Sequence, residues 1–275
     1  MKLAVTGAAC IGLALSTGSV PLFAQLQDNS EKTMTCNNGG NNGDRARHCE
    51  VREQTVASIG SLNLDGGSNG GVTVKGWLRG DTLVRTRVEA QAESEGAAAS
   101  LASQVWLDTS GGQVHAQGPQ TTNDSSWSVS YEIFAPQNTN LSLKTRNGAM
   151  TISDVRGQIH FDVANGAVHL KRVAGDVSGN TVNGAIQMDL VGSIWDGRQV
   201  EVTTGNGAIT LAMPSRYSAH IQAETMNGGI QSDFPMTVSG NIRPRQLDFN
   251  LNSGGPLIHL TAGNGQIRLK RSDTQ

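Results

Sequence analysis

The chain has 275 residues, of which 34 are glycine and only 4% are aromatic. Charged residues make up 16%, against roughly 25% in soluble domains, which excludes a coiled coil and a charged disordered tail. The glycines follow no three-residue period, which excludes collagen. A net charge of −2 provides no basic surface for nucleic acid. The composition therefore predicts a turn-dense, β-rich protein.

The first 24 residues have the pattern of a secretory signal peptide. Lys2 is followed by an apolar run at residues 3–15, and the small residue Ala24 precedes the expected cleavage point. An N-terminal membrane anchor is the alternative, but the run is shorter than the roughly 20 residues that cross a bilayer. We therefore expect a periplasmic or secreted protein of the cell envelope, with no stable membrane span after cleavage near Ala24.

Residues 25–50 form an Asn/Gly-rich segment that contains Cys36 and Cys49. Two cysteines in an exported chain predict a disulfide. A bridge across a loop of this size adds about 3 kcal/mol to stability by constraining the unfolded chain. His48 leaves a metal site open as an alternative, although two cysteines and one histidine are an incomplete zinc set. We therefore expect a disulfide and no metal or cofactor.

Residues 51–135 are predicted to be a mixed, β-rich N-terminal part. Apolar residues alternate on both sides of a glycine-rich stretch at 66–71. A short helix is expected near 93–104, where good helix formers include apolar residues four apart. Residues 105–116 have two glycines at a turn and fit the repeat pattern of the second half, which suggests that the repeats begin before residue 136.

Residues 136–275 contain a repeat marked by six Asn-Gly pairs. The asparagines are Asn147, Asn165, Asn183, Asn206, Asn227 and Asn264. The sixth residue before each asparagine is aliphatic, the third residue after it is apolar, and the residues between are mostly polar. Alternation with a period of two places one face of a strand in a core and the other in solvent. Each repeat therefore reads as strand, turn, strand.

Two architectures fit this pattern. Asn-Gly favours the tight type I′ turn of a β-hairpin, so the repeats could form an antiparallel β-sandwich. Alternatively, each repeat is one coil of a parallel β-solenoid, with Asn-Gly at a corner and equivalent residues stacked in columns. The same residue types at the same stations favour the solenoid, because each residue then packs on its equivalent in the next coil. Irregular spacings between repeats are then loops at corners.

The repeats, as they stand here, are LSLKTRNGAMTI, IHFDVANGAVHL, VSGNTVNGAIQM, VEVTTGNGAITL and IQAETMNGGIQS. They resemble the bacterial putative-adhesin family of β-strand repeat proteins, which are exported or membrane-associated and mostly of unknown function. The resemblance covers about residues 56–270. It implies a right-handed parallel β-helix-like fold, a β-solenoid, and it carries over no catalytic residues.

The pattern brings no catalytic residues together. The candidate catalytic acids of the repeat half are Asp154, Asp162, Asp176, Asp189 and Asp196. Glycoside chemistry needs two carboxyl groups roughly 5–9 Å apart, and no two acids stand at one station of consecutive repeats. His160, His169 and His259 stand at outward positions, and His160 and His259 are four repeats apart. There is no phosphate loop.

We therefore expect a non-enzymatic, exported, adhesin-like binding or structural module of the cell envelope. Its partner would be an envelope protein or a polysaccharide, because a solenoid presents long flat polar faces. The alternative is a carbohydrate-active enzyme of the β-helix type, a polysaccharide lyase or hydrolase.

Overall fold

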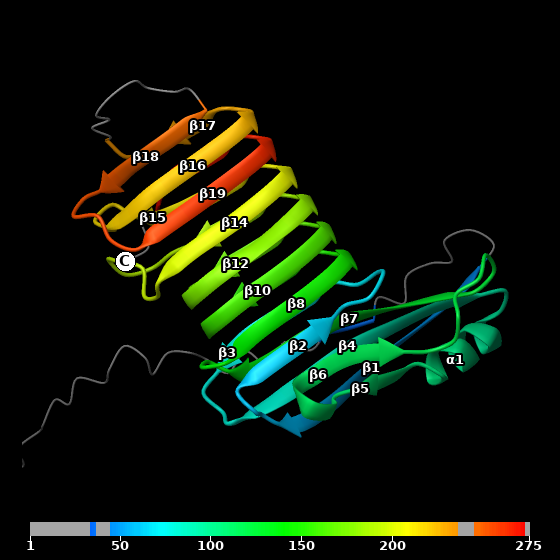
Figure 1. Ribbon diagram of the computed structural model, residues 1–275. Helices are drawn as coiled ribbons and strands as arrows, with labels where there is room; N and C mark the ends of the chain where they lie inside the picture. Colours follow the sequence, from blue (N-terminus) through cyan, green and yellow to red (C-terminus); the bar gives the residue numbers. More distant parts are fainter. Residues whose placement is uncertain (1–33, 37–44, 236–244, 273–275) are drawn as a thin grey trace, which may run out of the picture.

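The computed structural model describes residues 34–36, 45–235 and 245–272. The predicted signal peptide and most of the Asn/Gly-rich segment lie outside the described residues. The described chain is all-β with one short α-helix, and its strands form two ten-stranded sheets (Figure 1). The helix is too short to cross a membrane, and no other described helix could do so.

The two sheets are called sheet A and sheet B. Sheet A has, in order, β1 (Ala46–Ala57), β4 (Asp81–Ala92), β7 (Ser126–Pro136), β3 (Val72–Trp77), β9 (Met150–Ser153), β11 (Val168–Lys171), β13 (Ile186–Asp189), β15 (Ile209–Pro214), β20 (Ile267–Ser272) and β17 (Ile230–Ser232). Sheet B has β18 (Gln246–Leu251), β16 (Ala219–Asn227), β19 (Leu257–Asn264), β14 (Gln199–Asn206), β12 (Ala174–Asn183), β10 (Arg156–Asn165), β8 (Asn140–Asn147), β2 (Ser61–Asp65), β6 (Gln113–Gln117) and β5 (Trp106–Asp108).

Each Asn-Gly corner carries the chain from sheet B to sheet A. Strand β8 ends in sheet B at Asn147, for example, and β9 begins in sheet A at Met150. Equivalent strands of neighbouring coils pair in parallel, and each asparagine lies beside the asparagine of the next coil. The hairpin alternative is wrong for these repeats, because the two strands that flank each turn lie in different sheets.

The sheets are mixed, which corrects the expectation of a purely parallel solenoid. Strands β1, β4 and β7 pair antiparallel at one end of sheet A. In sheet B, β5 pairs antiparallel with β6 at one end, and β18 with β16 at the other. The repeat half is thus a β-solenoid-like stack of parallel strands, to which the antiparallel strand β18 is added at the end of sheet B.

The coils are not stacked in chain order. The last coil, β19 and β20, lies between the coil of β14 and β15 and the coil of β16 and β17 (Figure 1). After the coil of β14 and β15, the chain leaves one position of the stack empty and forms the coil of β16 and β17. It then returns, and the coil of β19 and β20 occupies the empty position. The sequence predicted neighbours in chain order, and for this coil that prediction is wrong.

The stack begins before residue 136, but not where the repeat pattern indicated. Residues 105–116 form an antiparallel hairpin, β5 and β6, around a 3-10 turn at Ser110–Gly112. The two glycines of this turn have φ of 57° and 74°, which suits a reversal of the chain. The additional coil is instead β2 and β3, which pair in parallel with β8 and β9.

A column of glycines determines the shape of the Asn-Gly corner. A Cβ atom on Gly166, Gly184 or Gly207 would lie 1.9–2.0 Å from the carbonyl oxygen of the glycine in the neighbouring coil. None of these three glycines has a positive φ, so they do not form the type I′ turn that Asn-Gly favours in hairpins. Glycine is required here because two backbones approach closely.

The asparagines before these glycines form a hydrogen-bonded ladder. The side-chain amide of each donates to the side-chain oxygen of the asparagine in the neighbouring coil, over 2.7–2.9 Å. Two residues earlier, the buried hydroxyls of Thr181, Thr204 and Thr225 donate to the glycine carbonyls of neighbouring coils. The corner is therefore satisfied by side chains that repeat with the coil.

The core lies between the two sheets and is filled by columns of aliphatic side chains. One column contains Leu141, Ile159, Val177, Val200, Ile258 and Ile221, each at most 2% exposed. At the far end from β18, helix α1 (Glu95–Ser103) contacts β1 and β4 through Ala98, Leu101 and Ala102. The predicted helix near 93–104 is thus confirmed. Ser94 caps its first turn by accepting a hydrogen bond from the Ala97 N–H.

Cys36 and Cys49 form a disulfide whose Cα atoms are 5.7 Å apart. Cys49 lies in β1, so the bridge joins Cys36 to the edge strand of sheet A. Both sulfur atoms are used in this bond, so they are not free to complete a zinc site with His48.

Candidate functional site

The outer face of sheet B carries two straight rows of polar side chains. One row contains Asn63, Ser142, His160, Ser178, Glu201, His259, Gln222 and Asp248. The other contains Asp65, Lys144, Asp162, Asn180, Thr203, Thr261, Glu224 and Gln246. Residues in a row follow each other at the strand spacing of about 4.8 Å. The face is therefore a regular array of hydroxyl, amide, imidazole and charged groups.

A groove of about 490 Å³ crosses this face where strands β2, β8, β10 and β12 begin. Its polar lining comprises Ser61, Asn63, Asn140, Ser142, Gln158, His160, Asp176, Ser178 and Arg198. The His160 Nδ1 lies 3.1 Å from the Ser178 hydroxyl, and the Asn140 side-chain oxygen accepts a hydrogen bond from the Gln158 N–H. We call this feature the polar groove.

The acids at the bends are paired with arginines. Arg198 Nε donates to Asp176 over 2.7 Å, and this hydrogen bond holds the pKa of Asp176 below its ordinary value. Arg156 donates to Asp196 and lowers its pKa in the same way. A general acid for glycoside cleavage needs a raised pKa. The pKa values of Asp176 and Asp196 are lowered instead, so neither carboxyl group suits this role.

The other three candidate acids, Asp154, Asp162 and Asp189, have polar or charged neighbours on the stack. Arg172 donates to Asp154 from the neighbouring coil over 2.6 and 2.7 Å. Asp162 lies between Lys144 and Asn180 on the outer face of sheet B. Asp189 accepts a 3.3 Å hydrogen bond from the Gln187 side chain of its own strand.

The histidines lie on different surfaces. His160 lines the polar groove, whereas His169 faces outward on sheet A. Because β19 lies between β14 and β16, His259 has Glu201 and Gln222 as its cross-strand neighbours. Sequence reasoning missed this grouping, because it depends on the inserted coil. Within residues 34–36, 45–235 and 245–272, no three His, Cys, Asp or Glu side chains converge to hold a metal ion.

Three of the four tryptophans pack within the protein and do not line the polar groove. The indole N–H groups of Trp77, Trp127 and Trp195 donate to backbone carbonyls over 2.7–2.9 Å. Trp77 and Trp195 are buried. Trp106 is 53% exposed, and it belongs to β5 at the N-terminal end of the stack.

These features define a class of protein, a β-solenoid-like stack with a polar outer face and no assembled catalytic group among the described residues. Residues 27–270 match the Toastrack DUF4097 family, and the chain belongs to this family. The resemblance of the repeats to the putative-adhesin proteins is thereby confirmed.

Solved structures from several bacteria match this chain. A putative cell adhesion protein from Clostridium sporogenes is 16% identical, with a TM-score of 0.44, over 82% of this chain and 100% of that chain. A putative adhesin from Bacteroides fragilis is 12% identical, with a TM-score of 0.31, over 82% and 97%. A putative lipid binding protein from Parabacteroides distasonis is 10% identical, with a TM-score of 0.29, over 83% and 97%. No curated protein shows a significant match.

Proposed function

We propose that this protein is an exported, non-enzymatic, adhesin-like module of the cell envelope that binds a neutral polysaccharide in the polar groove. The observation that carries the proposal is the groove itself, in which hydroxyl, amide and imidazole groups repeat from strand to strand. A polysaccharide presents hydroxyl groups along its length, so it can accept and donate hydrogen bonds at each of these stations.

The charges of the groove support a neutral ligand. Asp176 and Arg198 are its acid and its arginine, and they are bound to each other. A charged sugar would have to compete with this pair, whereas a neutral one would meet groups that already have no net charge. Ser142, His160 and Ser178 then supply the hydrogen bonds that select a hydroxylated ligand.

The pairing of the acids favours binding over catalysis. An inverting or retaining glycosidase uses one carboxyl group that stays protonated near neutral pH. Asp176 and Asp196 have lowered pKa values because arginines donate to them. The polysaccharide lyase or hydrolase alternative therefore finds no specific support at these residues.

Two further parts of the proposal concern export and the hand of the coil. The signal-peptide pattern of residues 1–24 and the Cys36–Cys49 disulfide support export to the periplasm or beyond. A right-handed coil is expected because parallel crossover connections within a sheet are right-handed in about 98% of cases.

The proposal predicts that the groove variant His160→Ala/Ser178→Ala binds polysaccharide at least about tenfold more weakly than the wild type. Each hydrogen bond contributes on the order of 1 kcal/mol, so the loss of two has an effect of this size. The purified protein would be tested on an array of neutral and acidic polysaccharides, and affinities for any bound polymer measured by isothermal titration calorimetry.

The matched control is His169→Ala/Thr151→Ala, which removes a histidine and a neighbouring hydroxyl from the outer face of sheet A. It should bind as the wild type does. The proposal fails if no polysaccharide binds, or if the two double variants bind equally. Release of sugar fragments by the wild type, lost in Asp176→Ala, would establish the enzyme instead.

A further inference from the structure

A second cavity lies at the N-terminal end of the stack, away from the polar groove. Its volume is about 260 Å³, and it is open to solvent on one side. It is bounded by the inner face of β1, β4 and β7 in sheet A, and by the hairpin of β5 and β6 in sheet B. Further along the stack, columns of aliphatic residues fill the space between the sheets, but here the short hairpin leaves part of it empty.

Most of the residues that line this cavity are apolar. Val84, Val88, Val105 and Val129 are each at most 3% exposed and present their methyl groups to it, together with Leu107 and Ala116. The indole of Trp106, which is 53% exposed, lines its solvent side. Such a site retains an apolar group by the hydrophobic effect.

One hydroxyl in this lining has no partner. Thr86 is 3% exposed and lines the cavity, and its hydroxyl is left to bond with a group other than the described side chains and backbone. Its oxygen atom is not one of the fully buried, unpartnered side-chain atoms of the described residues, so it is accessible to a group that enters the cavity. The Thr86 hydroxyl is therefore the group that a ligand oxygen would contact.

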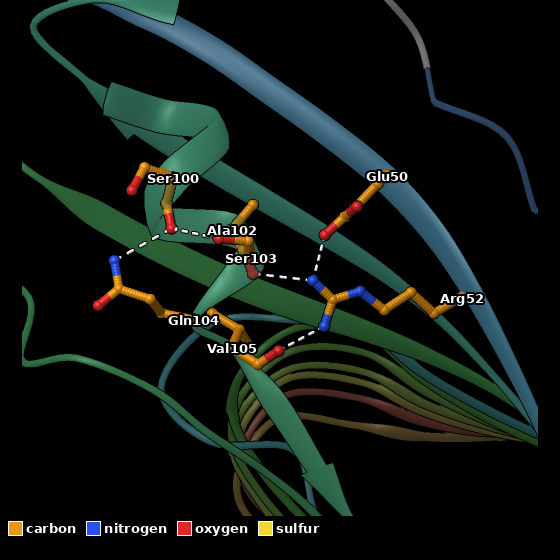
Figure 2. A network of polar contacts seen from close by, with 7 residues as sticks. All are labelled: Glu50, Arg52, Ser100, Ala102, Ser103, Gln104 and Val105. Carbon is orange, nitrogen blue, oxygen red and sulfur yellow. Dashed lines mark hydrogen bonds and ion pairs between the residues drawn. The ribbon is translucent and has the colours of Figure 1, made fainter. Parts of the chain in front are cut away.

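The charged groups at the cavity are already satisfied by the protein. Arg52 lies directly opposite Thr86 in the register of β1 and β4. Its guanidinium donates to the carbonyl groups of Ala102 and Val105, at the end of helix α1, and to the carboxylate of Glu50 (Figure 2). Glu53 is bound to Arg85. Because both charged groups are already paired with protein partners, a neutral ligand fits this cavity best.

We propose that this cavity binds a small neutral amphiphile, with an apolar body inside and one oxygen atom hydrogen-bonded to Thr86. Since a dry apolar cavity of about 150 Å³ holds a benzene ring, the larger volume here accommodates a bicyclic ring or a short alkyl chain. This site is independent of the polar groove and of the function proposed for it.

Equilibrium dialysis of the purified protein with three related probes tests the proposal. The probes are 2-naphthol, naphthalene and naphthalene-2-sulfonate. We expect one 2-naphthol to bind per chain, and the sulfonate to bind at least about tenfold more weakly, because its charge would enter an apolar site.

Thr86→Val keeps the shape of the side chain and removes its hydroxyl. It should weaken 2-naphthol about fivefold to tenfold and leave naphthalene unaffected. Ala116→Phe should fill the cavity and abolish binding of both, whereas Thr210→Val, on the outer face of sheet A, should change neither. If Ala116→Phe does not fold, as judged by circular dichroism, the two affinities of Thr86→Val still decide the question.

Three results would overturn the proposal. The first is no saturable binding of 2-naphthol to the wild type. The second is unchanged 2-naphthol affinity in a folded Ala116→Phe variant. The third is an equal loss of 2-naphthol and naphthalene affinity in Thr86→Val, which would show that its hydroxyl makes no specific contact.

Discussion

Gly184→Ala is expected to lower the free energy of unfolding by about 3 kcal/mol or more, at the upper end of what overpacking costs. The added Cβ would lie 1.9 Å from the carbonyl oxygen of Gly166 and 2.5 Å from its carbonyl carbon. Neither atom can move away alone, because both belong to the backbone of the neighbouring coil. The corner would have to open, which would strain the asparagine ladder and the hydrogen bond from Thr204 to the Gly184 carbonyl.

Gly229→Ala is the matched control for this substitution. Gly229 follows an Asn-Gly pair at the station where four other repeats have alanine, and an added Cβ would meet no atom within 4 Å. We expect it to be neutral or to stabilise the protein by about 0.5 kcal/mol, because alanine restricts the unfolded chain. Urea denaturation of both variants measures the difference. Equal stability of Gly184→Ala and Gly229→Ala would contradict the close stacking of coils.

Ile186→Asp is expected to prevent the repeat half from folding. Ile186 is fully buried between Val168 and Ile209, its equivalents in the neighbouring coils. A carboxylate at this place would have no partner, and an unpaired buried charge costs roughly 3–5 kcal/mol or more. This is a large part of the 5–15 kcal/mol that stabilises a typical domain.

The control for the buried charge is Thr210→Asp. Thr210 lies in the next coil on the outer face of sheet A, beside Gln187 and Arg268. The same charge there remains hydrated, so the thermal midpoint should change little. Far-ultraviolet circular dichroism and thermal unfolding compare the two variants. A cooperative transition of wild-type midpoint in Ile186→Asp would show that the side chain does not face the core.

The parts of the fold that the sequence could predict are those encoded locally. Alternation around each Asn-Gly pair places Ile159, Val168 and their equivalents inward, and the structure agrees. The order in which the coils stack is not encoded locally. Every coil presents the same columns of asparagine, glycine and aliphatic side chains. The coil at Asn206 could therefore pack equally well against the coil at Asn227 or against the coil at Asn264. Nothing in one repeat distinguishes these orders.

The first coil of the stack could not be recognised from the sequence, because a long insertion separates it from the next coil. Strands β2 and β3 are followed by more than sixty residues, which form β4, helix α1, β5, β6 and β7, before the coil of β8 begins. Their corner, at residues 66–71, is longer than the later ones. The pattern at 105–116 resembled a repeat because a hairpin also alternates with a period of two. Period alone does not distinguish a turn within one sheet from a corner between two.

The candidate sites could also not be predicted in full from the sequence. The sequence places His160 and Ser178 on an outward face, but their proximity in one groove depends on the parallel register of β10 and β12. The cavity at Thr86 depends on the antiparallel register of β1, β4 and β7, which join distant segments. Long-range pairing of this kind leaves no local signal in the residues that it brings together.

The histidine resonances provide the most direct test of the polar groove as the binding surface. Proton–carbon NMR spectra of the imidazole rings would be recorded during titration with the neutral polysaccharide that binds most tightly on the array. His160 lines the groove and His169 lies on the outer face of sheet A, so one spectrum contains both the reporter and its control. We predict a saturable shift of the His160 signal with no change at His169. A saturable shift at His169 with His160 unchanged would contradict the account.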